Sequence, residues 1–346
     1  MSLSRVVLFG RFQQGDFNLL GDMTASSEMP RIDLDRPRWD QSTFVGRLKH
    51  FANLTDMRTV LSSDAKLNQA RDLVTNYRLG SMPPGTTEEQ LWYAKKLYDS
   101  AFHPDSGELQ NVIGRMSFQV PGGMLITGFM LQFYRTVPAV VFWQWINQSF
   151  NALVNYTNRN AASAITTKQI GTAYVSATTA AVAVSVGLNS LTARAPQLLQ
   201  RYVPFAAVAA GNFANIPLMR QRELMNGIVI TDGNGNELGK SKKAAKKGIF
   251  QVFVSRVSMA APGMLLCPVI MQKMERYTWM QRIQFLHAPI QVMLVGCFLV
   301  FMVPTACALF PQRASLAVEK LEPDLKASIQ EKYGDKIKTV YFNKGL

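Results

Sequence analysis

Five side-chain amides follow one face of the apolar stretch at residues 138–156, where they could hydrogen-bond a neutral solute or a neighbouring helix. At 100° per residue they fall within an arc of roughly 100°, and large apolar side chains cover the remaining surface. An amide facing lipid would lack a partner at a cost of several kcal/mol, so this face must meet protein or water. We call these residues the amide stripe: Gln144, Asn147, Gln148, Asn151 and Asn155.

The amide stripe has two interpretations that the sequence leaves open. It could line a translocation path with neutral donors and acceptors, or it could join helices to one another, as amides commonly do in membrane bundles. Pro and Gly interrupt several apolar runs, and transporters often bind substrates at discontinuous helices, although both residues are also frequent in membrane helices generally. Asn215 stands beside such an interruption, Ile216-Pro217, and is predicted to bind the solute as well.

The distribution of charge indicates that these residues lie in a membrane. Only 17% of the 346 residues are charged, and Asp and Glu are absent from 109–222, 238–274 and 277–318. Carboxylates are expensive in hydrocarbon, so their exclusion from the same tracts that carry the apolar runs is typical of a membrane protein. The net charge of +14 comes without a basic stripe interleaved with aromatics. We therefore expect contact with anionic lipid heads and no binding of nucleic acid.

The apolar runs predict an all-α, multi-pass membrane protein. A spanning helix needs about 20 apolar residues. The favoured count is five spans, with 249–271 re-entrant, interfacial or a tilted sixth span, because Arg256 and Pro262-Gly263 interrupt that run. The candidate segments are 116–134, 138–156, 171–192, 203–219, 249–271 and 288–310.

Four regions follow from this pattern. Residues 1–29 are expected to be disordered or weakly presequence-like, and 30–115 to form amphipathic helices. The bundle covers 116–310 and includes a basic loop at 220–248, and 311–346 is a C-terminal tail. Lys and Arg are concentrated before residue 116 and in the segment 220–287, which places both on the matrix-like or cytoplasm-like side.

No catalytic or metal site is expected. The three cysteines form no CxxC pair and the three histidines are scattered, so we predict no bound metal, no cofactor and no enzymatic activity. The sequence HPDSGE could suggest a metal ligand set or a proton relay, but its turn-forming residues favour a structural turn leading into the membrane. The residues of this motif that we single out are His103, Pro104, Asp105, Gly107 and Glu108.

Six stretches between Pro37 and the end of the chain match the motifs of one family. They are PRWDQSTF (37–44), HPDSGE (103–108), FWQWINQSFNALVNYTNRNA (142–161), VPFAAVAA (203–210), IPLMRQREL (216–224) and YFNKGL (341–346). With these motifs the chain resembles the sideroflexin family over nearly everything from Pro37 to the end of the chain. The family's HPDTGE stands here with Ser106 in place of Thr.

This resemblance implies a multi-pass protein of the mitochondrial membrane, usually the inner one, that carries serine and other small neutral amino acids. It also implies support of one-carbon metabolism, a link to iron and haem homeostasis, and possible mitochondrial membrane protein partners. The oligomeric state stays open. The alternative is a membrane scaffold for haem or iron–sulfur assembly that transports nothing. A direct iron carrier is disfavoured, because the His and Cys residues are scattered.

Overall fold

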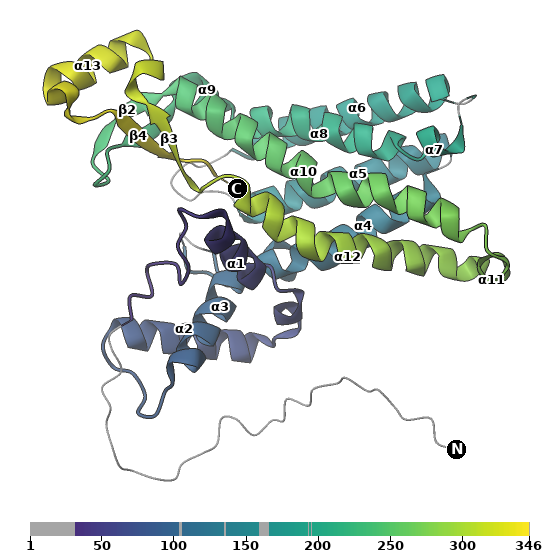
Figure 1. Cartoon of the computed structure of the whole chain (residues 1–346), viewed down its shortest axis with the longest axis horizontal. Helices are drawn as coiled ribbons and strands as arrows, with labels where there is room; N and C mark the ends of the chain where they lie inside the picture. Colours follow the sequence, from purple (N-terminus) through teal and green to yellow (C-terminus); the bar gives the residue numbers. More distant parts are fainter. Residues whose placement is uncertain are drawn as a thin grey trace. The chain divides into compact units, whose positions relative to one another are not determined.

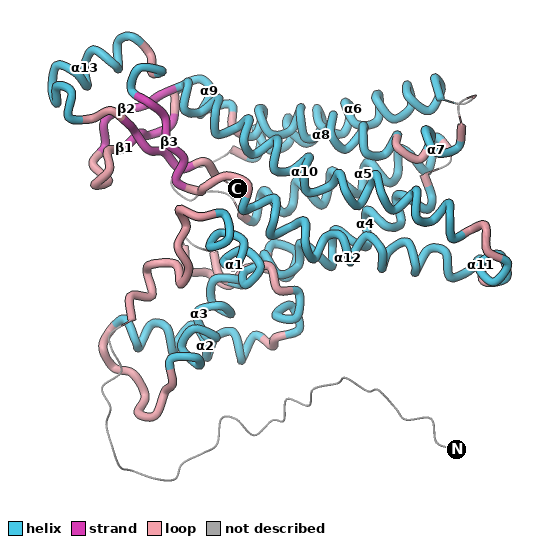
Figure 2. The backbone as a smooth tube through the Cα atoms, viewed as in Figure 1, coloured by secondary structure: helices cyan, strands magenta, loops and turns pink. Residues whose placement is uncertain are grey.

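The computed structural model is mostly helical, as the sequence predicts, with one small sheet (Figures 1 and 2). The 1–29 extension, Pro104 and Asp105 lie outside the residues that the structure describes. Those residues are 32–103, 106–134, 136–158, 166–192, 194 and 196–345.

Three amphipathic helices precede the bundle, and each begins at a capped residue. Thr43 accepts a hydrogen bond from the Gly46 amide and starts α1, Phe44–Leu54. Ser63 starts α2, Asp64–Arg78, and Thr87 forms a reciprocal capping box with Gln90 at the start of α3, Glu88–Ala101. A short 3₁₀ turn, Met57–Leu61, joins α1 to α2. The buried faces follow the predicted helical spacing and include Leu67, Ala70, Val74, Leu91 and Ala94.

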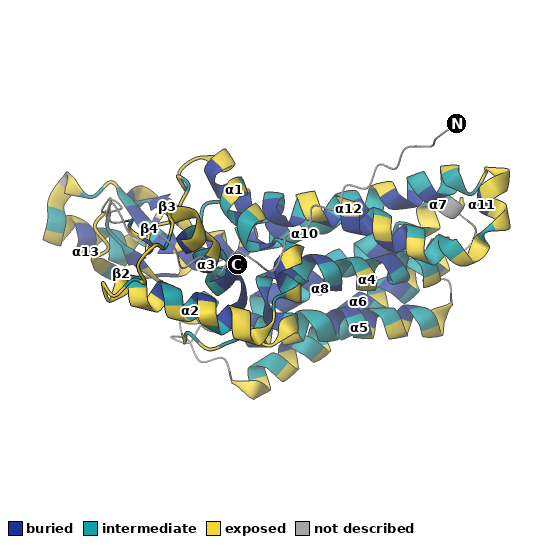
Figure 3. Ribbon diagram, turned by 90° about the horizontal axis from the view of Figure 1, so that it is seen from below, coloured by how far each residue is buried: buried dark blue, intermediate teal, exposed yellow. Residues whose placement is uncertain are grey.

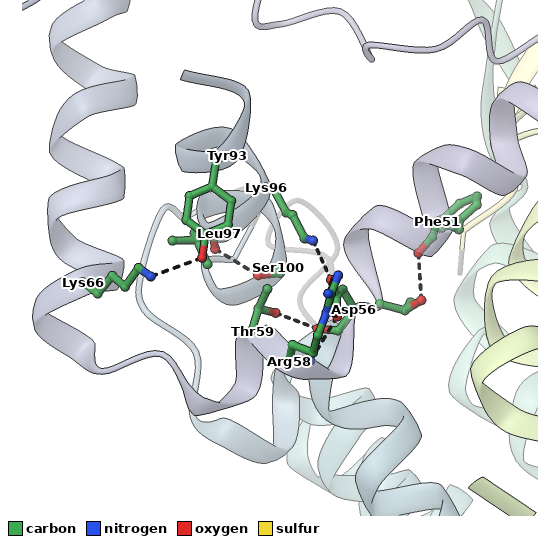
Figure 4. Close-up of polar contacts among 10 residues, drawn as sticks. Phe51, Asp56, Arg58, Thr59, Lys66, Tyr93, Lys96, Leu97 and Ser100 are labelled. Carbon is green, nitrogen blue, oxygen red and sulfur yellow. Dashed lines mark hydrogen bonds and ion pairs between the residues drawn. The ribbon is translucent and has the colours of Figure 1, made fainter. Parts of the chain in front are cut away.

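A partly buried ion network fixes the joint between α1 and α3. Lys96 Nζ lies 2.6 Å from Asp56 Oδ2, and Arg58 donates hydrogen bonds to both oxygens of the same carboxylate (Figure 4). Burial alone would raise the pKa of Asp56, but the hydrogen bonds from Arg58 and Lys96 outweigh burial and hold that pKa far below its usual range. The carboxylate therefore stays charged and holds the two helices together.

Six long helices of the described chain form a closed ring. α4 packs against α5 and α12, α6 lies between α5 and α8, and α10 lies between α8 and α12. Three of the six, α6, α10 and α12 with the turn before it, are long and apolar enough to cross a membrane. Figure 3 shows buried and exposed positions alternating along them. The helices are α4, Gln119–Phe133; α5, Val137–Thr157; α6, Thr167–Thr192; α8, Val203–Met219; α10, Lys242–Met274; and α12, His287–Ala308.

Two expectations about helix breaks need correction. Residues 249–271, expected to be re-entrant or interfacial in a five-span protein, form part of one continuous helix, α10, which runs through Pro262 and Pro268. At 1.5 Å per residue its 33 residues measure roughly 50 Å, so the sixth-span alternative fits this helix best. α8 also continues through Pro217, and α12 continues through Pro304. Proline is tolerated inside these helices because neighbouring helices support the freed backbone groups.

A four-stranded antiparallel sheet joins the segment expected to be a basic loop to the segment expected to be a tail. The strand order is β2-β1-β4-β3, and Thr231 pairs with Tyr341 at the join. The helix α13, Pro323–Tyr333, contributes Ile329 to its apolar core. The strands are β1, Ile228–Thr231; β2, Glu237–Ser241; β3, Arg313–Ala317; and β4, Thr339–Asn343.

The remaining short elements connect these parts. They are the 3₁₀ turns Val112–Gly114, Met116–Phe118, Gln284–Leu286, Val318–Lys320 and Gly334–Lys336 and the helices α7, Gln197–Gln200; α9, Gln221–Asn226; and α11, Thr278–Arg282.

Candidate functional site

The helix α5 has the two faces that the amide stripe predicts. Thr136 caps its first turn, where Pro138 needs no hydrogen-bond partner for its nitrogen. Gln144, Asn147 and Gln148 are buried, with exposed fractions of 0%, 9% and 3%, and Asn151 and Asn155 are half-buried. The opposite face exposes Val137, Val141, Phe142, Trp145 and Leu153. The amides therefore face the bundle interior, and the large apolar residues face outward.

A directed chain of hydrogen bonds holds Gln144 at one end of the stripe. Its Nε2 donates to the Tyr134 hydroxyl at 2.7 Å, and that hydroxyl lies 2.5 Å from Ser185 Oγ. Because Ser185 donates its own proton to the Ala181 carbonyl, Tyr134 must be the donor to Ser185. The chain therefore links α5 to the end of α4 and to α6 in one fixed direction.

Close helix packing positions the middle of the stripe. Ala181 and Ser185 belong to a buried small-residue face of α6 that also includes Ala173 and Ala177. This face lets α6 approach its neighbours closely, as its four-residue spacing predicts. Gly211 of α8 provides the space for the Gln148 side chain, because a Cβ on Gly211 would lie 2.3 Å from Gln148 Nε2.

A cation meets the other end of the stripe. Arg256 Nη2 of α10 donates to Asn155 Oδ1 at 3.1 Å, across 101 positions of sequence. Asn151 Nδ2 donates instead to the carbonyl of Asn147 in its own helix. Just beyond the stripe, Asn158 bonds the Gly114 carbonyl and so ties the end of α5 to the turns before α4.

Buried polar atoms without partners are concentrated in the bundle. Eight side-chain nitrogen or oxygen atoms of the described residues are buried and lack a hydrogen-bond partner, and all eight belong to ring helices or to the turn before α4. Each such group costs about 1–3 kcal/mol unless something satisfies it. They are Ser117 Oγ, Gln119 Nε2, Gln144 Oε1, Asn147 Nδ2, Thr178 Oγ1, Gln251 Oε1, Ser255 Oγ and Gln291 Nε2.

This distribution allows two chemical roles for the bundle interior. The unsatisfied atoms are neutral, include both donors and acceptors, and lie in tracts of the sequence without carboxylates. They can hydrogen-bond water or a small polar solute, but they provide no acid or base for proton transfer. The hydrogen bonds from Gln144 to Tyr134 and from Arg256 to Asn155 show that amides of the stripe also join helices to one another.

Asn215 is buried, with 4% of its surface exposed, but its setting differs from the prediction. It lies in a continuous helix instead of beside a break. Among the described residues, no hydrogen bond joins it to the amides of α5. Its neighbour on the same helix, Asn212, is also largely buried, at 9%.

The described part of the HPDSGE motif forms a hydrogen-bonded turn. The amide of His103 donates to the Glu108 carbonyl at 2.9 Å, and the amide of Gly107 donates back to the His103 carbonyl. Gly107 has a φ of +67°, which favours glycine. The His103 ring accepts a hydrogen bond from the Ser106 amide. Pro104 and Asp105 of this motif lie outside the described residues.

Sequence reasoning misses the partners of the amides. It does not single out Tyr134, and it treats Arg256 only as an interruption of an apolar run. A signal for Arg256 is present, because it is the only charged residue in 249–271 and a charge inside a membrane segment is a functional candidate by default. The buried Ser255 and the half-buried Gln251 carry no comparable signal.

Comparison with known proteins agrees with the motifs. The sideroflexin family model matches residues 33–346. The chain is 62% identical over 319 residues to Sideroflexin-2 of Mus musculus, covering 92% of this chain and 99% of the relative. Human Sideroflexin-2 is 62% identical over 320 residues and human Sideroflexin-1 58% over 317, each covering 92% of this chain and 99% and 98% of the relative. No solved structure matches. The chain therefore belongs to the sideroflexin family.

Proposed function

We propose that this chain carries small neutral amino acids, serine among them, across the mitochondrial inner membrane, with its amino-terminal helices on the matrix side. The observation that carries the proposal is the set of neutral, unpartnered polar atoms buried in the helices of the bundle, including Gln144 Oε1 and Asn147 Nδ2 of the amide stripe. A zwitterion offers both donors and acceptors to such a path. Family likeness supports serine as the substrate and adds links to one-carbon metabolism and to iron and haem homeostasis.

Uptake by the purified protein in liposomes tests this function directly. We expect uptake of labelled L-serine, and we expect Asn147→Leu combined with Asn151→Leu to reduce its initial rate while the protein still inserts. The matched control changes the outward face of the same helix, with Phe142→Leu and Trp145→Leu. No uptake by the wild-type protein would reject the transporter, and full uptake by the double amide variant would reject the site.

Localisation needs a separate measurement. The preparation is mitochondria with an opened outer membrane and an intact inner membrane. A protease added to them should leave an amino-terminal tag uncut if the helices α1 to α3 lie in the matrix. Cleavage of that tag under these conditions would reverse the proposed orientation.

The second candidate, a scaffold for haem or iron–sulfur assembly, would use the basic start of α10. Two lysines there hydrogen-bond the part of the chain that contains β3 and the turn after it: Lys247 Nζ donates to the Ser315 carbonyl, and Lys243 Nζ donates to the Leu321 carbonyl. Deleting the segment would therefore damage the fold. Reversing the charge of the exposed Lys242 and Lys246 is the cleaner variant: a scaffold predicts lost assembly with no serine flux in the wild-type protein, and a transporter predicts unchanged flux.

A further inference from the structure

Arg256 is a half-buried cation near one end of the bundle, and no carboxylate of the described residues pairs with it. It shares a face of α10 with the buried residues Val252, Gly263 and Cys267, at intervals of 4, 7 and 11 positions. Among the described residues, its single hydrogen bond is the one to Asn155 Oδ1, and no Asp or Glu lies within ion-pair distance. A guanidinium has five N–H donors, so most of its hydrogen-bonding capacity is left unused.

Two other arginines at the ends of the bundle, Arg201 and Arg220, differ from Arg256 in having carboxylate partners. Arg201 pairs with Glu275 at 2.7 Å, and Arg220 pairs with Glu223. Arg220 also donates to the Lys344 carbonyl, so its position is fixed by protein contacts. Retaining an uncompensated charge in a bundle is costly unless an anion of some kind approaches it.

Asn155 is oriented to help hold such an anion. Because its Oδ1 accepts from Arg256, the amide orientation is set, and Nδ2 is left to donate. The hydrogen bond between them brings the guanidinium and this amide together at the end of the amide stripe, where both have donors to offer. A carboxylate is the group that matches them, since its two oxygens can accept from the planar guanidinium and from an adjacent amide at the same time.

We infer that Arg256, oriented by Asn155, is the residue that binds the α-carboxylate of the transported amino acid. The inference rests on the proposed transport function and adds the chemical group that the path selects. The subsite lies at the end of the bundle where α5, α8 and α12 finish, because Asn155 is near the end of α5 and the electrostatic neighbours of Arg256 are Arg220, after α8, and Cys307, near the end of α12.

The test compares serine with serinol, in which CH₂OH replaces the carboxylate. Proteoliposomes of the full chain take up labelled L-serine, and unlabelled serine or serinol competes. The wild-type protein is expected to be inhibited by serine and barely by serinol. Arg256→Gln should raise the KM for serine about tenfold or more and bring inhibition by serinol close to that by serine. Arg256→Lys should fall between them, because it keeps the charge without the fork.

Lys273→Gln is the matched control, since it removes one cation from the other end of the same helix. It should change neither the KM for serine nor the preference for serine over serinol. The preference for serine over serinol separates a binding role from a merely structural one, because misfolding lowers uptake without changing that preference. If Arg256→Gln and Arg256→Lys both keep the wild-type KM and preference, the inference is overturned while transport stands. If the wild-type protein takes up no serine, the proposed function fails and the inference falls with it.

Discussion

The side chain of Gln148 in α5 lies against Gly211 of α8, where the α-carbon of residue 211 has room for a hydrogen atom and not for a side chain. A Cβ on Gly211 would approach Gln148 Nε2 to 2.3 Å and Ala181 Cβ to 3.4 Å. The α5 amide is thus placed by the missing side chain of α8. The position of the Gln148 amide therefore depends on this close approach.

Gly211→Ala should therefore affect transport more than stability. The atom that must move is the far end of a flexible amide, so the fold can adjust at small cost, but the amide would leave its place in the proposed transport path. We expect serine uptake to fall several-fold and the thermal midpoint in detergent to change little. Gly187→Ala on α6, which has no atom within 4 Å of the added Cβ, is the control. Equal uptake by both variants would show that Gln148 takes no part in transport.

A second glycine makes the opposite prediction. A Cβ on Gly128 of α4 would lie 2.6 Å from the Cα of Val292 in α12, and a backbone atom cannot move aside. Gly128→Ala should separate these two helices and destabilise the protein by about 1–3 kcal/mol, the usual effect of overpacking. The measurement is the midpoint of unfolding in detergent by tryptophan fluorescence, again against Gly187→Ala. A midpoint for Gly128→Ala equal to that of the control would contradict the close approach of α4 and α12.

The sequence predicts the helices well because their signals are local. Apolar runs, a proline in the first turn and the four-residue spacing of small residues all act within one helix, and α5 differs from its predicted bounds, 138–156, by one residue at each end. The amide face of α5 can also be predicted, because it depends only on the spacing of residues within that helix. What the amides contact is not local, and Asn155 and Arg256 are 101 positions apart.

The sheet could not be predicted because its strands are short and because the pairing of β1 with β4, which joins its two halves, spans a long separation in sequence. Thr231 and Tyr341 lie 110 positions apart, and β2 contains mostly small and charged residues without a clear alternation. The continuity of α10 is missed for another reason. Pro262-Gly263 signals a break in a soluble helix, but packing against α8 and α12 maintains the helix here.

The ion network of Asp56 predicts a pH dependence in the amino-terminal helices. The pKa of this carboxyl is lowered in the folded state, so its contribution is present above the unfolded pKa of 3.8 and is lost as the pH falls through the folded pKa. Asp56→Asn should lower the free energy of unfolding by about 1–2 kcal/mol at neutral pH, because it removes the charge that Lys96 and Arg58 contact. The effect is no larger because the carboxylate is partly solvated. The difference in free energy of unfolding between Asp56→Asn and wild type should stay constant from neutral pH down to about 5. It should narrow only in stronger acid, where the wild-type carboxylate becomes protonated.

Asp72→Asn is the control for this experiment. Asp72 pairs with Arg71 at the surface, where both side chains are well exposed, so its loss should change stability by less than about 0.5 kcal/mol at any pH. An Asp56→Asn variant as stable as Asp72→Asn would show that the network does not join α1 to α3. Thermal unfolding followed by circular dichroism across this pH range gives the comparison.

The last prediction concerns Lys344, a lysine with only 2% of its surface exposed. Within the described part of the chain, its amine donates one long hydrogen bond, 3.5 Å to the Phe310 carbonyl. Burial is the main cause that lowers the pKa of this amine; the neighbouring Cys307 acts in the opposite direction, and the cations Arg47 and Arg220 lower the pKa as well. A lysine whose folded pKa lies below its unfolded value of 10.5 destabilises the fold while charged, and the penalty disappears as the pH rises from the folded pKa to 10.5.

Lys344→Met should therefore be more stable than wild type by about 1 kcal/mol at neutral pH, with an advantage that shrinks toward pH 10. The exposed Lys338→Met should change stability little at any pH. A loss of stability in Lys344→Met at neutral pH would mean that the amine has an anionic partner, and the burial argument would then be wrong.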